Sequence, residues 1–266
     1  MTPGANSTSG CTDGATAPTP DSITINYTGA STAITIPVYV LGYNCTYQGG
    51  SVFAIDDSTP AASSIAGKVF ATADQTSSAV WASEYDPIWG IDDSSTTSTP
   101  SPDSSSLTPA TYTNGQLKCE GMSDGLCNSN NIFAFASMHS SNYPTSTAST
   151  MCSQALTGAN SSTCTAGTAD CYNDWYLPAI CELDSVSNGV DSCPCPLRMQ
   201  SVRGSIPSFS NLSFVYWSST EYSLFPMYLA WQELFDSNGV GYQDNSGDKK
   251  VPHRPSGGRC VRGLIN

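Results

Sequence analysis

The last part of the chain opens with Tyr216-Trp217-Ser218-Ser219-Thr220-Glu221 and closes with Arg259-Cys260-Val261-Arg262. Aromatic, β-branched and small polar residues alternate at both ends, a pattern that is typical of half-buried strands. The residues between the two ends are polar and rich in turn formers. We therefore predict two or three sheet strands that support a long variable surface, and we expect this surface to bind a ligand.

The composition favours strands, turns and long ordered loops over helices. Only 12% of the 266 residues are charged, whereas Ser, Thr, Gly, Asn and Pro are abundant. This balance disfavours an all-helical fold. The length is sufficient for one large domain or two ordinary ones, and either would bury a sizeable core.

The chain is strongly acidic, with a formal net charge of -13 and a sequence pI of about 4.2. Such a charge repels polyanions, so we expect no nucleic acid, heparin-like glycan or anionic membrane as a partner. Basic residues are nevertheless concentrated near the C-terminus: Lys249, Lys250, Arg254, Arg259 and Arg262. We interpret them as solvated charges at strand ends, and a local anion-binding face is the alternative.

The eleven cysteines indicate an oxidised protein. Their spacing is not that of a metal site, because Cys193-Pro194-Cys195 has no second pair and the only histidines are His139 and His253. We predict up to five disulfides and one odd thiol, Cys11, which lies in a segment without apolar neighbours. Disulfides in such number point to an exported, extracellular protein.

The beginning of the chain predicts a flexible tether over residues 1–21, because this segment is low in complexity. It has neither the basic start nor the apolar core of a signal peptide, so we expect export through a signal that this sequence does not contain. No run of about eighteen apolar residues would span a membrane. We expect membrane attachment only through the tether or through a lipid, with Cys11 as the residue that would carry it.

Two alternating runs, Ile23–Tyr27 and Ala33–Leu41, predict an N-terminal β-hairpin over residues 22–42. We expect the hairpin to pack on the following domain or to lead into it. Pro37 places its second strand at an edge or breaks that strand. Residues 43–266 are predicted to form one ligand-binding domain.

The first strand of this domain is predicted over Gly49–Asp57, with Lys68–Gln75 as its antiparallel partner. Cys119 and Cys127 bracket a turn of Gly, Ser and Asp, so they most simply bridge each other. Further cysteines are dense from Cys152 to Cys195, which indicates irregular, disulfide-stapled loops.

Two helices are predicted, over Asn131–Ser137 and Thr150–Leu156, although Ser and Thr weaken both. Leu177-Pro178 should end an extended segment, because proline restricts the residue before it. A further helix should then begin. Its apolar face would consist of Ile180, Leu183 and Val186.

Several motifs follow one another in a characteristic order. They are Asp174-Trp175-Tyr176-Leu177-Pro178, Glu182-Leu183, Tyr216 to Thr220, Ala230-Trp231, Phe235 and Arg259 to Arg262. Together they resemble the C-terminal domain family of the Legionella collagen-like adhesin, from about Tyr43 to the C-terminus. The resemblance implies an α+β, C-type-lectin-like fold with a small antiparallel sheet, two helices and long loops that meet the ligand. It also implies export and allows a homotrimer, although this chain has no collagen repeats.

A narrower resemblance is to the variable receptor proteins that bacterial diversity-generating retroelements diversify on the same fold. In those proteins exposed C-terminal positions vary on a constant scaffold, which implies a variable face over about residues 222 to 256 here. Aromatic and similar anchors contribute most interface energy. We expect the ligand-binding residues to be Tyr222, Leu224, Phe225, Met227, Tyr228, Gln232, Tyr242, Asp244, His253 and Arg254. The alternative is that Leu224, Phe225 and Leu229 complete the core.

The sequence has no Ser-His-acid order, no H-E-x-x-H motif and no nucleotide-binding loop, so we expect a protein that is not an enzyme. Calcium is the one cofactor that the sequence leaves open, because loop carboxylates supply the oxygen ligands that it prefers. The candidate ligands are Asp56-Asp57, Asp92-Asp93, Asn173-Asp174 and Asp236-Ser237-Asn238-Gly239. None has the spacing of an EF-hand.

These observations predict an exported bacterial surface protein, adhesin-like or receptor-like, that presents its C-terminal loops to a protein or glycan ligand. The alternative comes from a different class. It is a structural or assembly subunit, such as a trimeric tip or coat protein, in which the same face mediates self-association. Both functions require that apolar side chains in this region are exposed.

Overall fold

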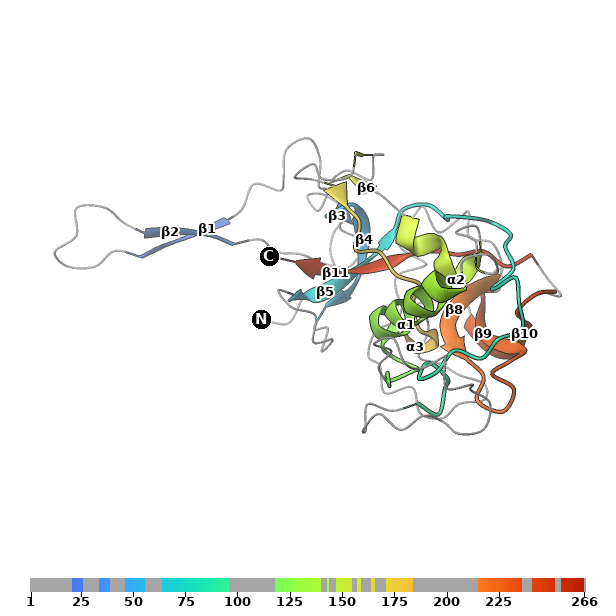
Figure 1. Ribbon diagram of the computed structural model, residues 1–266. Coiled ribbons are helices and arrows are strands. Elements are labelled where there is room, and N and C mark those ends of the chain that lie inside the picture. The colour runs from blue at the N-terminus through green and yellow to red at the C-terminus, as the bar shows by residue number, and fades with distance from the viewer. Residues whose placement is uncertain are drawn as a thin grey trace.

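The structure is a computed structural model, and it describes residues 21–25, 34–38, 46–55, 64–95, 118–139, 143, 147–154, 157–158, 164–165, 171–183, 215–235, 241–251 and 255–265. These residues form an α+β fold with small antiparallel sheets, as predicted (Figure 1). Residues 1–20 of the predicted tether, and Cys11 with them, lie outside the described residues.

One sheet has four antiparallel strands in the order β11-β5-β4-β3. The strands are β3, Thr46–Tyr47; β4, Gly50–Ile55; β5, Ser64–Ala71; and β11, Val261–Ile265. The predicted antiparallel pair is confirmed as β4 and β5, although β5 begins four residues before the predicted start at Lys68. The last strand of the chain, β11, lies beside β5 from its first third (Figure 1).

The second sheet has three antiparallel strands in the order β10-β9-β8. The strands are β8, Val215–Glu221; β9, Leu229–Phe235; and β10, Gly241–Asp248. All seven residues of β8 are buried, so this strand has no solvent-exposed side. With β11, the described residues of the closing part form four strands, more than the two or three expected from its alternation.

Two further strand pairs form sheets of their own. In the first, β1 (Asp21–Ile25) is antiparallel to β2 (Ile34–Val38). Pro37 lies within β2, where it is tolerated because both strands of a two-stranded sheet are edges. The second pair consists of β6 (Thr157–Gly158) and β7 (Cys171–Tyr172).

The longest described helix, α1, spans Gly125–Met138 and packs against β8 (Figure 1). It begins six residues before the predicted start at Asn131. Asp124 caps this earlier start, because its carboxylate accepts a hydrogen bond from Cys127 N at 3.0 Å. Polar residues on the buried side of the helix also find partners, and Asn128 Nδ2 donates to Gly121 O at 2.7 Å.

The other helices are short. The helix predicted over Thr150–Leu156 is α2, Ala148–Met151, continued by the 3-10 helix η2, Cys152–Gln154. The helix predicted after Pro178 is α3, Ile180–Leu183, and both of its terminal side chains are buried, as expected. Val186 lies outside the described residues.

Three buried tryptophans, Trp81, Trp175 and Trp217, are among the largest side chains of the interior. Trp81 Nε1 donates to Ser218 O at 2.8 Å, and Trp217 Nε1 donates to Ala79 O at 2.9 Å. These two indoles therefore bury a large apolar area while their N–H groups keep hydrogen-bond partners. The motif positions of the closing part of the chain, called the scaffold below, are all buried: Tyr216 to Thr220, Ala230-Trp231, Phe235 and Arg259 to Arg262.

Three disulfides join described residues: Cys119–Cys127, Cys152–Cys260 and Cys164–Cys171. The first confirms the predicted pair. The second has a sequence separation of 108 and ties η2 to the residue before β11. Cys181 is oxidised as well. No described helix combines the length and the apolar character that crossing a membrane requires.

Removal of the long-range disulfide by Cys152→Ala with Cys260→Ala should lower the free energy of unfolding by about 5 kcal/mol, because this bridge restricts a long loop in the unfolded chain. Cys119→Ala with Cys127→Ala removes a bridge between cysteines with a sequence separation of only 8. That change should cost about 2 to 3 kcal/mol. Urea unfolding followed by tryptophan fluorescence measures both values. Equal losses would contradict loop closure as the source of the stabilisation.

Candidate ligand-binding surface

Large apolar side chains are exposed at five described positions, and all five follow β8 in the chain. They are Leu224 (69% exposed), Phe225 (55%), Tyr228 (46%), Tyr242 (40%) and Val251 (62%). Leu224 and Phe225 therefore do not complete the core, and the alternative expectation is wrong for them. Leu229 is half-buried. Single exposed apolar residues are ordinary, but a group of them indicates a contact surface.

The 222–228 loop joins β8 to β9 and carries three of these side chains. Hydrogen bonds close its backbone. Tyr222 N donates to Leu229 O at 3.1 Å, and Phe225 N donates to Tyr222 O at 3.0 Å. Tyr228 N and Leu229 N both donate to Phe225 O at 2.9 Å. Because these hydrogen bonds involve only the backbone, the apolar side chains of the loop can face solvent without disturbing the turn.

Asp93 holds this loop from a distant segment. Its Oδ1 accepts from Ser223 N and its Oδ2 accepts from Trp231 Nε1, both at 2.9 Å. Tyr222 packs edge-on against Trp231, with the ring centroids 5.8 Å apart. Tyr222 is half-buried as a result, so it supports the loop as well as bordering the surface.

Tyr85 extends the surface from a segment that no sequence signal indicated. Its ring meets Tyr228 edge-on with centroids 5.2 Å apart, and its hydroxyl donates to the Asp248 carboxylate at 3.0 Å. Desolvation and then the Asp248 carboxylate raise the pKa of Tyr85, so the hydroxyl remains a donor. Lys250 Nζ lies 5.0 Å from the centroid of the same ring and pairs with Glu84 at 3.1 Å.

Asp248 also places Val251 beside this group, since its Oδ1 accepts from Val251 N at 2.8 Å. Half-buried Tyr85 thus lies beside exposed Tyr228, and Asp248 links Tyr85 to the segment of exposed Val251. Leu224 and Phe225 are exposed on the same 222–228 loop as Tyr228. These side chains are treated together as one surface. Its members, called the apolar face below, are Tyr85, Leu224, Phe225, Tyr228 and Val251.

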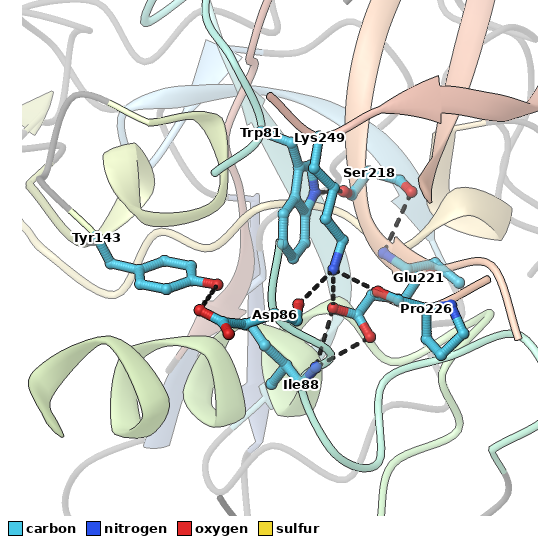
Figure 2. Close-up of polar contacts among 9 residues, drawn as sticks. Trp81, Asp86, Ile88, Tyr143, Ser218, Glu221, Pro226 and Lys249 are labelled. Atoms are coloured by element: carbon cyan, nitrogen blue, oxygen red, sulfur yellow. Dashed lines mark hydrogen bonds and ion pairs between the residues drawn. The ribbon is translucent and has the colours of Figure 1, made fainter. Parts of the chain in front are cut away.

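A buried ion pair between Lys249 and Glu221 lies next to Pro226 of the 222–228 loop (Figure 2). Lys249 Nζ donates to the Glu221 carboxylate, to Asp86 O at 2.8 Å and to Pro226 O at 2.6 Å. The ammonium also lies 4.4 Å from the centroid of a tryptophan ring in the core. All three N–H donors of the ammonium are therefore used within the protein.

Burial disfavours both charges of this pair. It raises the pKa of Glu221 to about 8, although Lys249 and the Ile88 N–H act in the opposite direction. Ile88 N donates to both carboxylate oxygens at 3.1 Å. Burial lowers the pKa of Lys249, against the attraction of Glu221. Removal of either partner would consequently leave an uncompensated polar group in the interior.

Three residues predicted as ligand contacts lie away from the apolar face. Gln232 is only 6% exposed and its Nε2 donates to Ser256 Oγ at 2.8 Å, so this side chain belongs to the interior. Tyr242 is exposed, but it lies at the opposite end of β10, about 20 Å away for a strand of this length. Asp244 is half-buried on the same strand.

The remaining predicted contacts are divided as well. Met227 is half-buried within the loop, whereas His253 and Arg254 lie outside the described residues. Tyr85 was not predicted as a contact, and Val251 lies within the predicted variable face of about residues 222 to 256 but was not among the named contacts. Val251 is an isolated apolar residue in a polar segment, which is a usable signal, but the place of Tyr85 depends on a long-range contact.

Three of the five basic residues near the C-terminus are structural, whereas Lys250 is half-buried and Arg254 lies outside the described residues. Lys249, Arg259 and Arg262 are buried, so their interpretation as solvated charges at strand ends is wrong. Arg259 Nε donates to Asp74 at 2.7 Å, and Arg262 Nε donates to Asp174 at 2.6 Å. Because each of these cations has a carboxylate partner, they do not form an anion-binding face.

The carboxylates considered for calcium accept hydrogen bonds from the protein where the structure describes them. Asp92 accepts from the two serines that follow it. Asp93 accepts from Ser223 N and Trp231 Nε1, and Asp174 accepts from Arg262. Among the described residues, no three His, Cys, Asp or Glu side chains form a group that could hold a metal ion. The other two candidate groups lie outside that part of the chain.

No protein-family model matches the chain, and neither a curated protein nor a solved structure does. The function of the apolar face must therefore be inferred from its own chemistry. That chemistry consists of exposed aromatic and aliphatic side chains on a buried, disulfide-linked scaffold.

Replacement of Asp93 by alanine should lower the free energy of unfolding by about 1 to 3 kcal/mol, because Ser223 N and Trp231 Nε1 would lose their acceptor. Asp244→Ala is the matched control, since this half-buried carboxylate accepts only local hydrogen bonds from Ser246. Its cost should stay within about 0.5 kcal/mol. Chemical denaturation measures both variants. A similar loss in the two would contradict the assignment of Asp93 as the anchor of the loop.

Proposed function

We propose that this chain is an exported bacterial surface protein, adhesin-like or receptor-like, whose apolar face binds a protein or glycan ligand. In this proposal the domain is C-type-lectin-like and related to the collagen-like adhesin domains that its motifs resemble. The N-terminal segment tethers it to a surface, and the protein catalyses no reaction.

The observation that carries the proposal is the division of the closing part of the chain into buried and exposed positions. Every scaffold position from Tyr216 to Thr220 is buried, whereas Leu224 and Phe225, a few residues later, are more than half exposed. Exposed apolar side chains lower the solubility of a protein, so a group of them usually marks a contact surface. The exposed group at Leu224, Phe225, Tyr228 and Val251 is therefore best explained by a binding partner.

The scaffold behind the face favours binding by preformed contacts. The Cys152–Cys260 disulfide and the Asp93 hydrogen bonds order the surrounding backbone before any ligand arrives. Less conformational entropy is then lost on association. A few aromatic anchors such as Phe225 and Tyr228 would supply most of the binding energy.

The charge of the protein narrows the class of ligand. A net charge of -13 opposes sulfated and other polyanionic glycans. Tyr and Phe rings offer apolar faces to both peptide side chains and sugar rings, and a tyrosine adds a hydroxyl at its tip. The expected ligand is a protein surface with an apolar pocket, or an uncharged glycan.

The triple change Leu224→Ala, Phe225→Ala and Tyr228→Ala should weaken binding about 30-fold or more, because one lost anchor costs about 2 kcal/mol. The melting temperature should remain nearly constant, since these side chains are exposed. The probe is the fluorescently labelled chain on a panel of intact bacterial and animal cells, measured by flow cytometry. Protease or glycosidase treatment of the cells identifies the ligand class. Tyr242→Ala, an exposed aromatic at the opposite end of β10, is the matched control and should bind nearly as wild type.

Two results would contradict this function. A fall of several degrees in the melting temperature of the triple variant would mean that the three side chains stabilise the core. Undiminished cell binding by that variant would place the ligand site elsewhere. Light scattering addresses the alternative, because a stable trimer that buries the apolar face would favour an assembly subunit over a free receptor.

We also propose that a retroelement diversifies the exposed C-terminal positions. Buried scaffold residues and exposed residues alternate in blocks along this part of the chain, so substitutions at the exposed positions would leave the core intact. The expected observation is a near-copy of the 3′ coding segment beside the gene, differing chiefly at adenines. A gene neighbourhood without such a copy would leave an ordinary adhesin-like protein.

A further inference from the structure

We propose that Lys249 is a positioning residue for the apolar face. Its buried ammonium holds the 222–228 loop, the segment that carries Tyr85, and its own turn in one arrangement, and it touches no ligand itself. This inference rests on the proposed function, because the arrangement serves a face that binds a ligand. The arrangement itself can be tested without any ligand.

The three donors of the ammonium reach three different segments (Figure 2). One donor goes to Glu221, the last residue of β8. Another goes to Asp86 O, next to Tyr85, at 2.8 Å. The third goes to Pro226 O, within the 222–228 loop, at 2.6 Å. The segments that supply the apolar face thus meet at a single cation.

Burial of the Lys249 ammonium favours the loop position in which all its donors have acceptors. Lys249 and Glu221 are both 0% exposed, and the ring of Trp81 covers the ammonium. Movement of Pro226 O away from the ammonium would leave a charged donor without a partner, which costs far more than the same loss at the surface. The loop position in which Pro226 O accepts from the ammonium is therefore favoured.

The backbone of residue 249 contributes separate contacts to the same segments. Lys249 N donates to Tyr228 O at 3.0 Å, and Lys249 O accepts from Trp81 N at 2.9 Å and from Ala82 N at 3.1 Å. These hydrogen bonds do not involve the side chain. A substitution at this position consequently isolates what the ammonium contributes.

A second buried lysine–glutamate pair, Lys68 with Glu182, provides a matched comparison. Their side chains are 1% and 0% exposed. The Glu182 carboxylate also accepts from Ala179 N at 2.8 Å and from Gly125 N at 3.2 Å, so this pair joins β5 to the beginnings of α1 and α3. None of these contacts involves the 222–228 loop. The two pairs therefore share chemistry and burial but differ in what they hold.

Amide hydrogen exchange in the Lys249→Met variant of the full chain tests the positioning role, because methionine keeps an unbranched apolar side chain and removes the ammonium. The amides of Phe225, Tyr228 and Leu229 are hydrogen-bonded within the loop. Relative to amides of β4 and β5, they should exchange on the order of tenfold faster than in the wild type. Lys68→Met should not produce this preference for the loop. Two-dimensional NMR resolves the individual amides.

The double variants cover the case in which a single change prevents folding. Lys249→Met with Glu221→Met removes the stranded carboxylate together with the cation, and Lys68→Met with Glu182→Met is its control. The loop amides should again exchange faster only in the first double variant. Unchanged loop protection after loss of the ammonium would overturn the proposal, and so would the same exchange pattern in the variant and its control.

Failure of this inference can be told from failure of the proposed function. Faster loop exchange in Lys249→Met, together with full cell binding by the triple alanine variant, would overturn the proposed function and support the positioning role. Retained loop protection together with lost binding by the triple variant would overturn the positioning role alone. Where both hold, Lys249→Met should bind cells about tenfold more weakly although every side chain of the apolar face is present.

Discussion

Buried cations that pair with carboxylates from distant segments organise this protein. Lys68, Lys249, Arg259 and Arg262 are almost completely buried. Their acidic partners lie 114, 28, 185 and 88 residues away in the sequence. A buried charge that loses its partner costs about 3 to 5 kcal/mol, so the segments that carry these groups can associate in few ways. The need to keep each buried charge paired thus fixes the positions of both main sheets, of α3 and of the segment that leads to the apolar face.

This arrangement separates the residues that maintain the fold from the residues available for contact. Ion pairs, tryptophans and disulfides hold the interior, so the 222–228 loop does not have to contribute its outward side chains to stability. Leu224 and Phe225 can face solvent while Tyr222 and the loop backbone secure the turn. A surface of this kind can change its side chains and keep its shape, which suits recognition of a protein or glycan ligand.

Local sequence patterns predicted those parts of the fold that depend on neighbouring residues. The β4 and β5 pair followed from alternation, the Cys119–Cys127 disulfide from its short turn, and α3 from the preceding proline. The start of α1 was missed because its first turns contain poor helix formers, which Asp124 and burial against β8 stabilise. Lys249 was expected to be solvated and is buried instead. Its hydrogen-bond partners are brought together only in the folded chain, so no local pattern indicated them.

The sequence by itself determined an acidic, cysteine-rich chain whose closing part contains strands and turns, because composition, alternation and turn chemistry are properties of adjacent residues. The α+β class was an expectation that the family resemblance implied. Only the tertiary structure decided which side chains of that part meet solvent. Packing turned Gln232 inward toward Ser256, separated Tyr242 from the other aromatic residues and placed Tyr85 beside Tyr228. Exposure and neighbourhood depend on contacts between segments far apart in the chain, and no local pattern encodes them.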